Sequence, residues 1–164
     1  MTTLTQKLAA AGIAAALPLI VLFEGNRQAS YLDPIGIPTV CRGHTGQEVR
    51  VGQFYTQQEC DELTLQDLLK ARAIVDQCVK RPLNDNQRAA FSSFVFNVGP
   101  GQVGKKDGFC ILKNGQESTM LKMLNMGHHA QACDQMLRWN KANGIVLPGL
   151  VKRRLAEREL CLKN

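Results

Sequence analysis

Residues 84–99 read NDNQRAAFSSFVFNVG and predict a helix at the centre of the fold. Asn84 is a residue type that caps helix N-termini, and Gly99 is typical of a helix C-terminal end. The large apolar residues lie on nearly all sides of this helix: Phe91, Phe94, Val95 and Phe96. A helix that is apolar all round is usually buried, so we expect the rest of the chain to pack around it.

The flanking sequence predicts strands before this helix and more helices around it. Thr56 and Glu59 form a capping-box pattern that predicts a long helix ending near residue 80. Residues 31–51 are rich in Gly, Pro and β-formers, which favours short strands and turns. Further helices are expected at 118–127, at about 130–142 and from Pro148 to about 161. The outline is α+β, with the sheet segregated from a mostly helical body.

An apolar run, residues 8–23, follows the single basic residue Lys7. We expect helix from about 5 to 24, with a kink at Pro18 or a restart that puts Pro18 near a new helix N-terminus. As one helix the run would span about 24 Å, short of a bilayer core of about 30 Å. It fits the apolar part of an export signal, and a helix of the protein core that never meets a membrane is the alternative. The sequence leaves open whether it is cleaved, embedded in lipid or packed on the body.

Composition restricts the class of protein. The chain has 164 residues, enough for one domain, and a net charge of +6, which favours anionic partners: nucleic acid, membrane or cell-wall polymer. No RNA-binding aromatic motif and no zinc-finger spacing is present. The six cysteines include no C-x-x-C pair, which argues against a zinc or thioredoxin-type site. They suit three disulfides in an oxidising compartment, and buried thiols in a cytosolic protein are the alternative.

Two carboxylates with suitable surroundings follow the apolar run. Hydrolysis of a glycosidic bond needs one acid to protonate the leaving oxygen and a second group to activate water. Glu24 ends the apolar run, where partial burial favours the protonated form that a general acid needs. Asp33 is expected in a solvated Asp-Pro turn, and the hydroxyl of Thr39 can hold a water. Spacing alone is weak evidence, because Asp-Pro usually forms a turn and threonine in a strand is usually structural.

The wider context resembles the phage lysozymes of glycoside hydrolase family 24. The motifs that carry the resemblance are FEG at 23–25, YLD at 31–33, GIPT at 36–39, GHT at 43–45, QRAAF at 87–91, FVFNVG at 94–99, STML at 118–121, LNMG at 124–127, RW at 138–139, and GLVKRR at 149–154 with Glu157. They follow one another in the order found in that family.

The resemblance implies a lysozyme-like fold: a small β-rich N-terminal lobe and a larger helical C-terminal lobe, joined by a long helix. Residues 24–164 would form this single domain after the apolar segment 1–23. The implied function is that of an endolysin, which hydrolyses the β-1,4 bond between N-acetylmuramic acid and N-acetylglucosamine in peptidoglycan with inversion. Glu24 would be the acid, and Asp33 and Thr39 would position the water.

Roles are also expected for several other residues. Phe96, Asn97 and Arg154 are expected to bind substrate, and Arg153 or Arg154 to reach back to Glu24. His44 is interpreted as a structural histidine near the sheet. We expect a monomer with peptidoglycan as partner, no nucleic acid, no cofactor and no metal. The alternatives are a lytic transglycosylase cutting the same bond without water, or a non-catalytic basic protein that binds wall or membrane.

The chain also differs from the usual family pattern. Residues 100–117 are longer than the usual link and contain Cys110, so this stretch is a lid, a wall contact or a disulfide-tied loop. The cysteines resemble those of secreted lambdoid relatives with a signal-arrest-release segment, and we expect the pairs Cys41–Cys60, Cys78–Cys110 and Cys133–Cys161. Residues 8–23 resemble such a segment but are short and run straight into Glu24. The implied location is the host periplasm, with transient tethering to the inner membrane through 8–23.

Overall fold

The central helix is α4 (Asp85–Val98), in a computed structural model that describes all residues from 1 to 164. The Asn84 side chain caps it by accepting from the backbone N–H of Gln87 at 2.8 Å, and Gly99 ends it at a φ of 82°. Its completely buried residues are Ala89, Ala90, Phe91, Ser92, Ser93 and Phe94. The predicted position of this helix, its cap and its burial are therefore confirmed.

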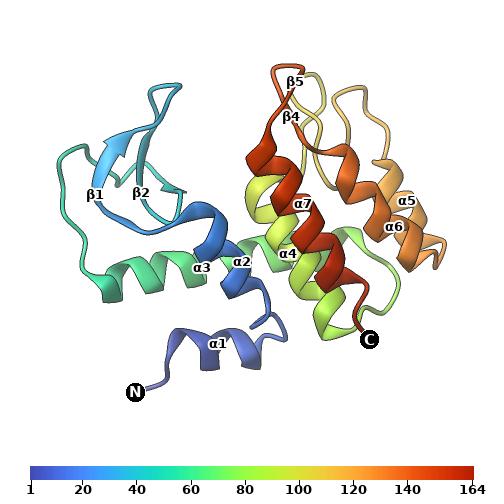
Figure 1. Cartoon of the computed structure of the whole chain (residues 1–164), viewed down its shortest axis with the longest axis horizontal. Helices are drawn as coiled ribbons and strands as arrows, with labels where there is room; N and C mark the ends of the chain where they lie inside the picture. The colour runs from blue at the N-terminus through green and yellow to red at the C-terminus, as the bar shows by residue number, and fades with distance from the viewer.

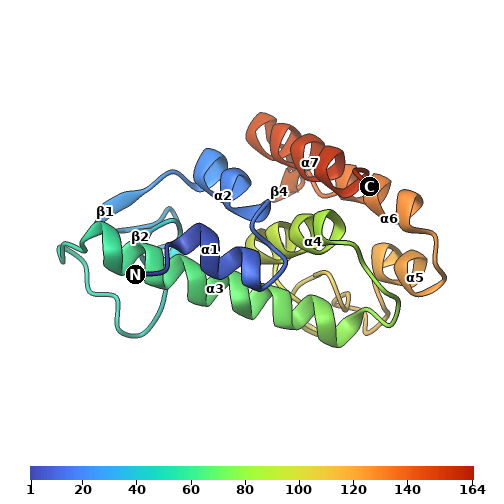
Figure 2. The ribbon, with the colours of Figure 1, turned by 90° about the horizontal axis from the view of Figure 1, so that it is seen from below.

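The long helix α3 (Gln57–Cys78) connects two lobes (Figures 1 and 2). It begins at the expected capping box, in which Thr56 and Glu59 each accept from the other's backbone N–H. One end of α3 carries the strands, and its other end packs on α4 in the helical lobe. The two-lobed α+β arrangement inferred from the resemblance is thus present.

The small lobe is a three-stranded antiparallel sheet in the order β1–β2–β3. Its strands are β1 (Arg27–Leu32), β2 (Pro38–Cys41) and β3 (His44–Thr45). Thr39 lies in the middle of the sheet, paired with Tyr31 on one side and Thr45 on the other. The lobe has its own small core, which consists of Val40, Cys41, Val49, Tyr55 and Cys60.

The apolar N-terminal run forms two short helices, α1 (Leu4–Ala10) and α2 (Ala16–Glu24). The chain turns between them at Gly12, whose φ of +68° suits glycine. Pro18 lies in the first turn of α2, so of the two expectations the helix restart is the one found. No helix in the structure combines the length and the apolar character needed to span a bilayer.

This N-terminal segment is part of the main core. Leu8, Ile13 and Ile20 are completely buried in the cluster that includes the phenylalanines of α4. Figure 2 shows α1 lying along α3. The expected boundary after residue 23 therefore falls inside α2, and residues on both sides of it pack in one core.

The remaining helices are α5 (Thr119–Asn125), α6 (His129–Gln135) and α7 (Pro148–Cys161). The prediction of one helix over 130–142 is wrong. Helix α6 passes into the 3-10 helix η1 (Met136–Arg138), and a hairpin of β4 (Lys141–Ala142) and β5 (Ile145–Val146) follows. Asn143 and Gly144 form its turn at φ values of 50° and 77°, and Asn-Gly is the strongest short hairpin signal.

Three disulfides join neighbouring elements, and their pairing is the expected one: Cys41–Cys60, Cys78–Cys110 and Cys133–Cys161. The second bond ties the long stretch 100–117 to the end of α3. The same stretch inserts Phe109 into the main core, where its ring lies 5.7 Å from that of Phe91. Of the three roles considered for this stretch, the disulfide-tied loop is therefore present.

Candidate active site

Glu24 is the last residue of α2, and its carboxylate lies between Gly43 of the small lobe and Arg153 of α7. Gly25 follows it at a φ of 67°, which ends the helix directly after the carboxylate. The Glu24 side chain is 22% exposed, so it is sheltered but open to a ligand. Its Oε2 lies 3.1 Å from the position that a Cβ on Gly43 would occupy, which explains the absence of a side chain there.

Arg153 of α7 holds the other oxygen of this carboxylate. Its Nη1 donates to Glu24 Oε1, its Nε donates to Glu157 Oε1 at 3.1 Å, and its side chain is 4% exposed. The guanidinium also lies 5.8 Å from the ring centre of Phe23. Of the two arginines proposed to reach back to Glu24, Arg153 is the one in contact.

Asp33 and Thr39 flank the turn between β1 and β2. Asp33 Oδ1 accepts from the backbone N–H groups of Ile35 and Ile37 at 2.9 and 2.8 Å. Its Oδ2 makes no hydrogen bond within the protein. The Thr39 hydroxyl donates to the carbonyl of Ile37 at 3.0 Å, and the residue is 4% exposed. Both side chains thus stabilise the turn. Asp33 Oδ2 and the lone pairs of the Thr39 hydroxyl are not used by the turn and can each accept a further hydrogen bond.

His44 fixes the strand next to Gly43 against α3. Its Nδ1 lies 2.7 Å from Asp67 Oδ2 and its Nε2 lies 2.9 Å from Glu48 Oε1. Burial lowers the pKa of His44, but the hydrogen bonds and charges of the Glu48 and Asp67 carboxylates outweigh it and raise the pKa above its usual value. His44 is 4% exposed, in agreement with the interpretation of a structural histidine.

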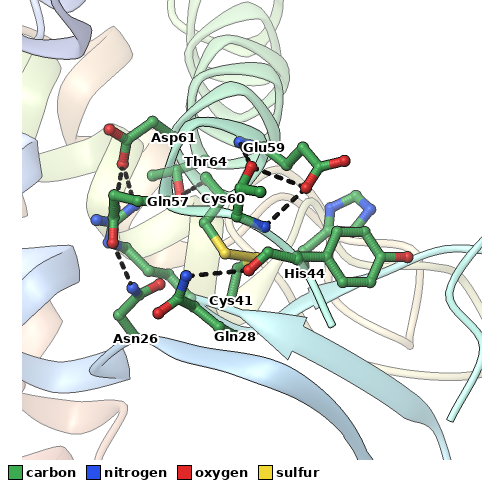
Figure 3. The surroundings of a disulfide bond; sticks show 12 residues. Asn26, Gln28, Cys41, His44, Gln57, Glu59, Cys60, Asp61 and Thr64 are labelled. Carbon is green, nitrogen blue, oxygen red and sulfur yellow. Dashed lines mark hydrogen bonds and ion pairs between the residues drawn. A yellow bond between two sulfur atoms is a disulfide. The ribbon is translucent and has the colours of Figure 1, made fainter. Parts of the chain in front are cut away.

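Further contacts attach the small lobe to the start of α3, as Figure 3 shows. The Cys41–Cys60 disulfide joins β2 to α3. Beside it, the Asn26 side chain donates to Gln57 at 2.9 Å, and Gln57 in turn donates to Asp61 at 2.8 Å. Because Asn26 is only two residues beyond Glu24, these contacts fix the chain on the far side of the candidate acid.

A hollow of about 220 Å³ lies between the lobes, and we call it the inter-lobe hollow. It is lined by Gly43, Thr45, Asp67, Lys70, Ala71, Ile74, Val95 and Phe96. Glu24 touches its edge through Gly43. Glu24, Asp33 and Thr39 are not themselves among its lining residues. Two larger hollows lie elsewhere, between α1 and α3 and on the helical lobe, and neither is lined by Gly43 or by any residue of the three-stranded sheet.

The residues expected to bind substrate lie in different environments. Phe96 lines the inter-lobe hollow, and Asn97 is exposed beside it. Arg154 is 1% exposed, and its guanidinium is taken up by Asn97 Oδ1, the Trp139 carbonyl and Glu157. Contact of Arg154 with substrate remains a prediction. In this structure its hydrogen bond to Oδ1 holds the Asn97 side chain in place.

Sequence reasoning missed the contribution of α3 to this site. Lys70 and Ile74 lie one helical turn apart and line the inter-lobe hollow. Both belong to the long helix expected to join the lobes, and periodicity cannot show which part of an exposed helical face borders a cleft. For the opposite wall of the hollow the sequence did contain a signal, the GHT motif at 43–45. Its Gly43 and Thr45 line the hollow and flank the structural His44.

This arrangement can be compared with known proteins. The family model described as phage lysozyme matches residues 21–157, which include Glu24, Asp33, Thr39 and Arg153. The chain belongs to the phage lysozyme family. It is accordingly an endolysin, a lysozyme-type enzyme that lyses peptidoglycan.

Named relatives of this endolysin are similar over most of its length. A SAR-endolysin of Bacteriophage PS119 is 38% identical over 139 residues, which cover 85% of this chain and 76% of that protein. A SAR-endolysin of Pseudomonas phage phiKMV is 35% identical over 164 residues, covering 98% of this chain and 94% of the relative. The second match therefore includes the N-terminal segment as well as the lobes.

Among solved structures, the active form of the P1 phage endolysin Lyz matches with a TM-score of 0.78 and 29% identity, covering 90% of this chain and 83% of that one. The secreted inactive form of Lyz matches with a TM-score of 0.52 and 27% identity, over 71% of this chain and 75% of that one. The fold described above is thus more similar to the active form than to the inactive form.

Proposed function

We propose that this endolysin is a muramidase that hydrolyses the β-1,4 bond between N-acetylmuramic acid and N-acetylglucosamine with inversion. The observation that carries the proposal is the position of Glu24. It is a sheltered carboxylate at the edge of the inter-lobe hollow, oriented by Arg153 on one oxygen and facing the side-chain-free Gly43 with the other.

In this mechanism Glu24 protonates the glycosidic oxygen as the bond to the leaving sugar breaks. Asp33 and Thr39 hold the water that attacks the anomeric carbon from the opposite face. Asp33 Oδ1 is occupied by two backbone N–H groups, so Oδ2 accepts the water's proton. The Thr39 hydroxyl donates to Ile37, which leaves its lone pairs to accept a hydrogen bond from the same water.

Inversion requires room for this water, with carboxyl groups about 6.5–9.5 Å apart rather than the about 5–5.5 Å of a retaining pair. Asp33 lies in the turn after β1 and Glu24 ends α2, so separate elements of the fold hold the two carboxyl groups. Proton NMR of the first product formed tests this point, because inversion of a β-linked substrate gives the α-anomer before mutarotation.

A second hollow of about 660 Å³ on the helical lobe extends the proposed substrate contact. Its lining includes the cations Lys106, Arg138 and Lys141 against the single carboxylate Asp107, with the Trp139 ring among them. We assign it to the carboxylate-bearing peptides of peptidoglycan, since an excess of cations attracts anions. Arg138→Gln should then weaken binding of peptide-bearing wall fragments more than binding of bare glycan chains.

The decisive variant is Glu24→Gln. The variant keeps the shape of the side chain, and the amide can still contact Arg153. It has no acidic proton to donate, so the rate on purified peptidoglycan should fall by about 10³-fold, the middle of the range for general acid catalysis. Glu159→Gln, an exposed position on α7, is the matched control and should keep the wild-type rate. Near-wild-type activity of the Glu24 variant would refute the assignment.

Product analysis separates hydrolysis from the transglycosylase alternative. Hydrolysis adds water and gives a reducing N-acetylmuramic acid end, whereas a transglycosylase leaves an anhydro product that lacks one water. Mass spectrometry of digested peptidoglycan in ¹⁸O-labelled water distinguishes them, since only hydrolysis incorporates the label.

We further propose that the enzyme works as a monomer in the periplasm of the host and is first tethered to the inner membrane through residues 8–23. The relatives named SAR-endolysins and the apolar composition of that run support the proposal. Because Glu24 follows the run directly, a segment held in lipid cannot simultaneously present this carboxylate to the inter-lobe hollow. Full lytic activity in a membrane-bound fraction would contradict this model of activation.

A further inference from the structure

The proposed mechanism leaves one buried carboxylate without a role. Glu157, on α7, is 0% exposed and lies in the interior between α7 and α4. Its Oε1 accepts from the Ser93 hydroxyl at 2.8 Å and from Arg153 Nε at 3.1 Å, and its Oε2 accepts from Arg154 Nη1. A carboxylate buried this deeply persists only with such partners, because burial of an unpaired charge is strongly unfavourable.

Glu157 and Glu24 accept hydrogen bonds from two different nitrogen atoms of the Arg153 guanidinium. Arg153 presents Nε to Glu157 and Nη1 to Glu24, while its Nη2 points to the Ser93 carbonyl at 3.4 Å. A planar guanidinium with fixed donors has little freedom once two of its edges are held. The buried contacts therefore fix the orientation of the Arg153 guanidinium. This orientation determines where its remaining donor meets Glu24.

The structure assigns Glu157 as a positioning residue for catalysis: through Arg153 it sets the place of the Glu24 carboxylate and the charge that surrounds it. This inference rests on the proposed role of Glu24 as the general acid. Glu157 touches no substrate in this scheme. It acts on the reaction only through the arginine.

Charge balance gives this role a measurable consequence. The cluster of Glu24, Arg153, Arg154 and Glu157 holds two anions and two cations. Neutralising Glu157 leaves one unbalanced cation, which favours the ionised form of Glu24 and removes the catalytic proton at a lower pH. The other charged groups around the site are Asp33 on the turn, Asp67 and Lys70 on α3, and His44 on β3, and this substitution leaves all four unchanged.

The test is the pH dependence of kcat and KM for Glu157→Gln on soluble peptidoglycan fragments, with Glu159→Gln as control. Both variants lose one negative charge on α7, but Glu159 is exposed. For Glu157→Gln, the alkaline limb of the kcat profile should move down by about one pH unit, and kcat above the limb should fall about tenfold. KM should stay within about twofold, because no substrate contact is removed. A limb at the wild-type pH in a folded Glu157→Gln protein would overturn the inference.

Removal of a buried charge can prevent folding, so Ser93→Ala provides a second measurement. It keeps every charge and deletes the hydroxyl that fixes Glu157 Oε1. We expect kcat to fall about three- to tenfold at unchanged KM, because Glu157 loses one hydrogen bond but keeps both arginine partners. An unchanged kcat in Ser93→Ala would overturn the inference even if the Glu157 variant did not fold.

Glu24→Gln, measured alongside, separates this inference from the proposed function. If Glu24→Gln stays active, the acid is misassigned, and the role of Glu157 falls with it. If Glu24→Gln is inactive while the Glu157 and Ser93 variants behave as wild type, only the positioning role is wrong.

Discussion

Replacing Asp67 by asparagine tests how the small lobe is held on α3. The Asp67 side chain is 21% exposed and lies 2.7 Å from Nδ1 of the buried His44. Asparagine keeps the shape and a neutral hydrogen bond but removes the charge. A hydrogen bond to a charged group contributes about 1.5–3 kcal/mol and a neutral one about 0.5–1.5 kcal/mol, so with the Coulomb attraction we expect a loss of about 2 kcal/mol.

The loss should depend on pH in a defined direction. The folded protein raises the pKa of His44 above the unfolded value of 6.5, so the stabilisation is fully present below pH 6.5 and disappears as the pH rises through the folded pKa. The destabilisation by Asp67→Asn should therefore be largest near pH 5.5 and smaller near pH 9. A loss of about 2 kcal/mol corresponds to a fall in Tm of about 4–8 °C for a chain of this size.

Thermal unfolding followed by circular dichroism at both pH values, with the disulfides intact, measures this difference. Glu48→Gln is the control, because Glu48 contacts the other ring nitrogen but is 62% exposed, and its effect on Tm should be smaller. Equal destabilisation by Asp67→Asn at pH 5.5 and pH 9 would refute the reasoning, since the charge of His44 would then not contribute.

Three further changes probe other parts of the fold. Gly43→Ala places a methyl group 3.1 Å from Glu24 Oε2 at a φ of +79°, so activity on peptidoglycan should fall about tenfold or more, and wild-type turnover would contradict the described approach of these residues. The double variant Cys133→Ser/Cys161→Ser opens a loop with a separation of 28 residues, which should lower stability by about 3–4 kcal/mol in urea unfolding; an unchanged midpoint would argue against the bond. Ile20→Ala should lower stability by about 2–5 kcal/mol by the same measurement, and a negligible effect would show that α2 does not pack in the core of the folded enzyme.

Much of the fold could be predicted because its local signals agree with its tertiary packing. The capping residues Asn84, Thr56 and Ser118 each begin a helix where the sequence indicated one. The prediction was wrong at 130–142, where residues before the hairpin allow helix and only the Asn143–Gly144 turn opposes it. The hairpin turn at Asn143 and Gly144 therefore determined the structure of this segment, against the helical pattern of the residues before it.

The site was only partly predictable, because its geometry depends on contacts distant in sequence. The identity of Glu24 as candidate acid came from motifs, but its partner could not be chosen between Arg153 and Arg154. Adjacent helix residues point about 100° apart, so only the packing of α7 on α4 decides that Arg153 faces Glu24 and Arg154 faces Asn97. Likewise, nothing in the sequence indicates that Lys70 and Gly43 line the same hollow.

The shared helix α2 has a practical consequence for production and engineering of this enzyme. Ile20 in the core and Glu24 at the site are one helical turn apart, so the leader-like run cannot be trimmed as dispensable sequence. A recombinant protein that starts after the alanines at 14–16 would lack Leu8 and Ile13, both completely buried, and would expose the core they cover. Tags belong at the C-terminal end, where Leu162, Lys163 and Asn164 are exposed.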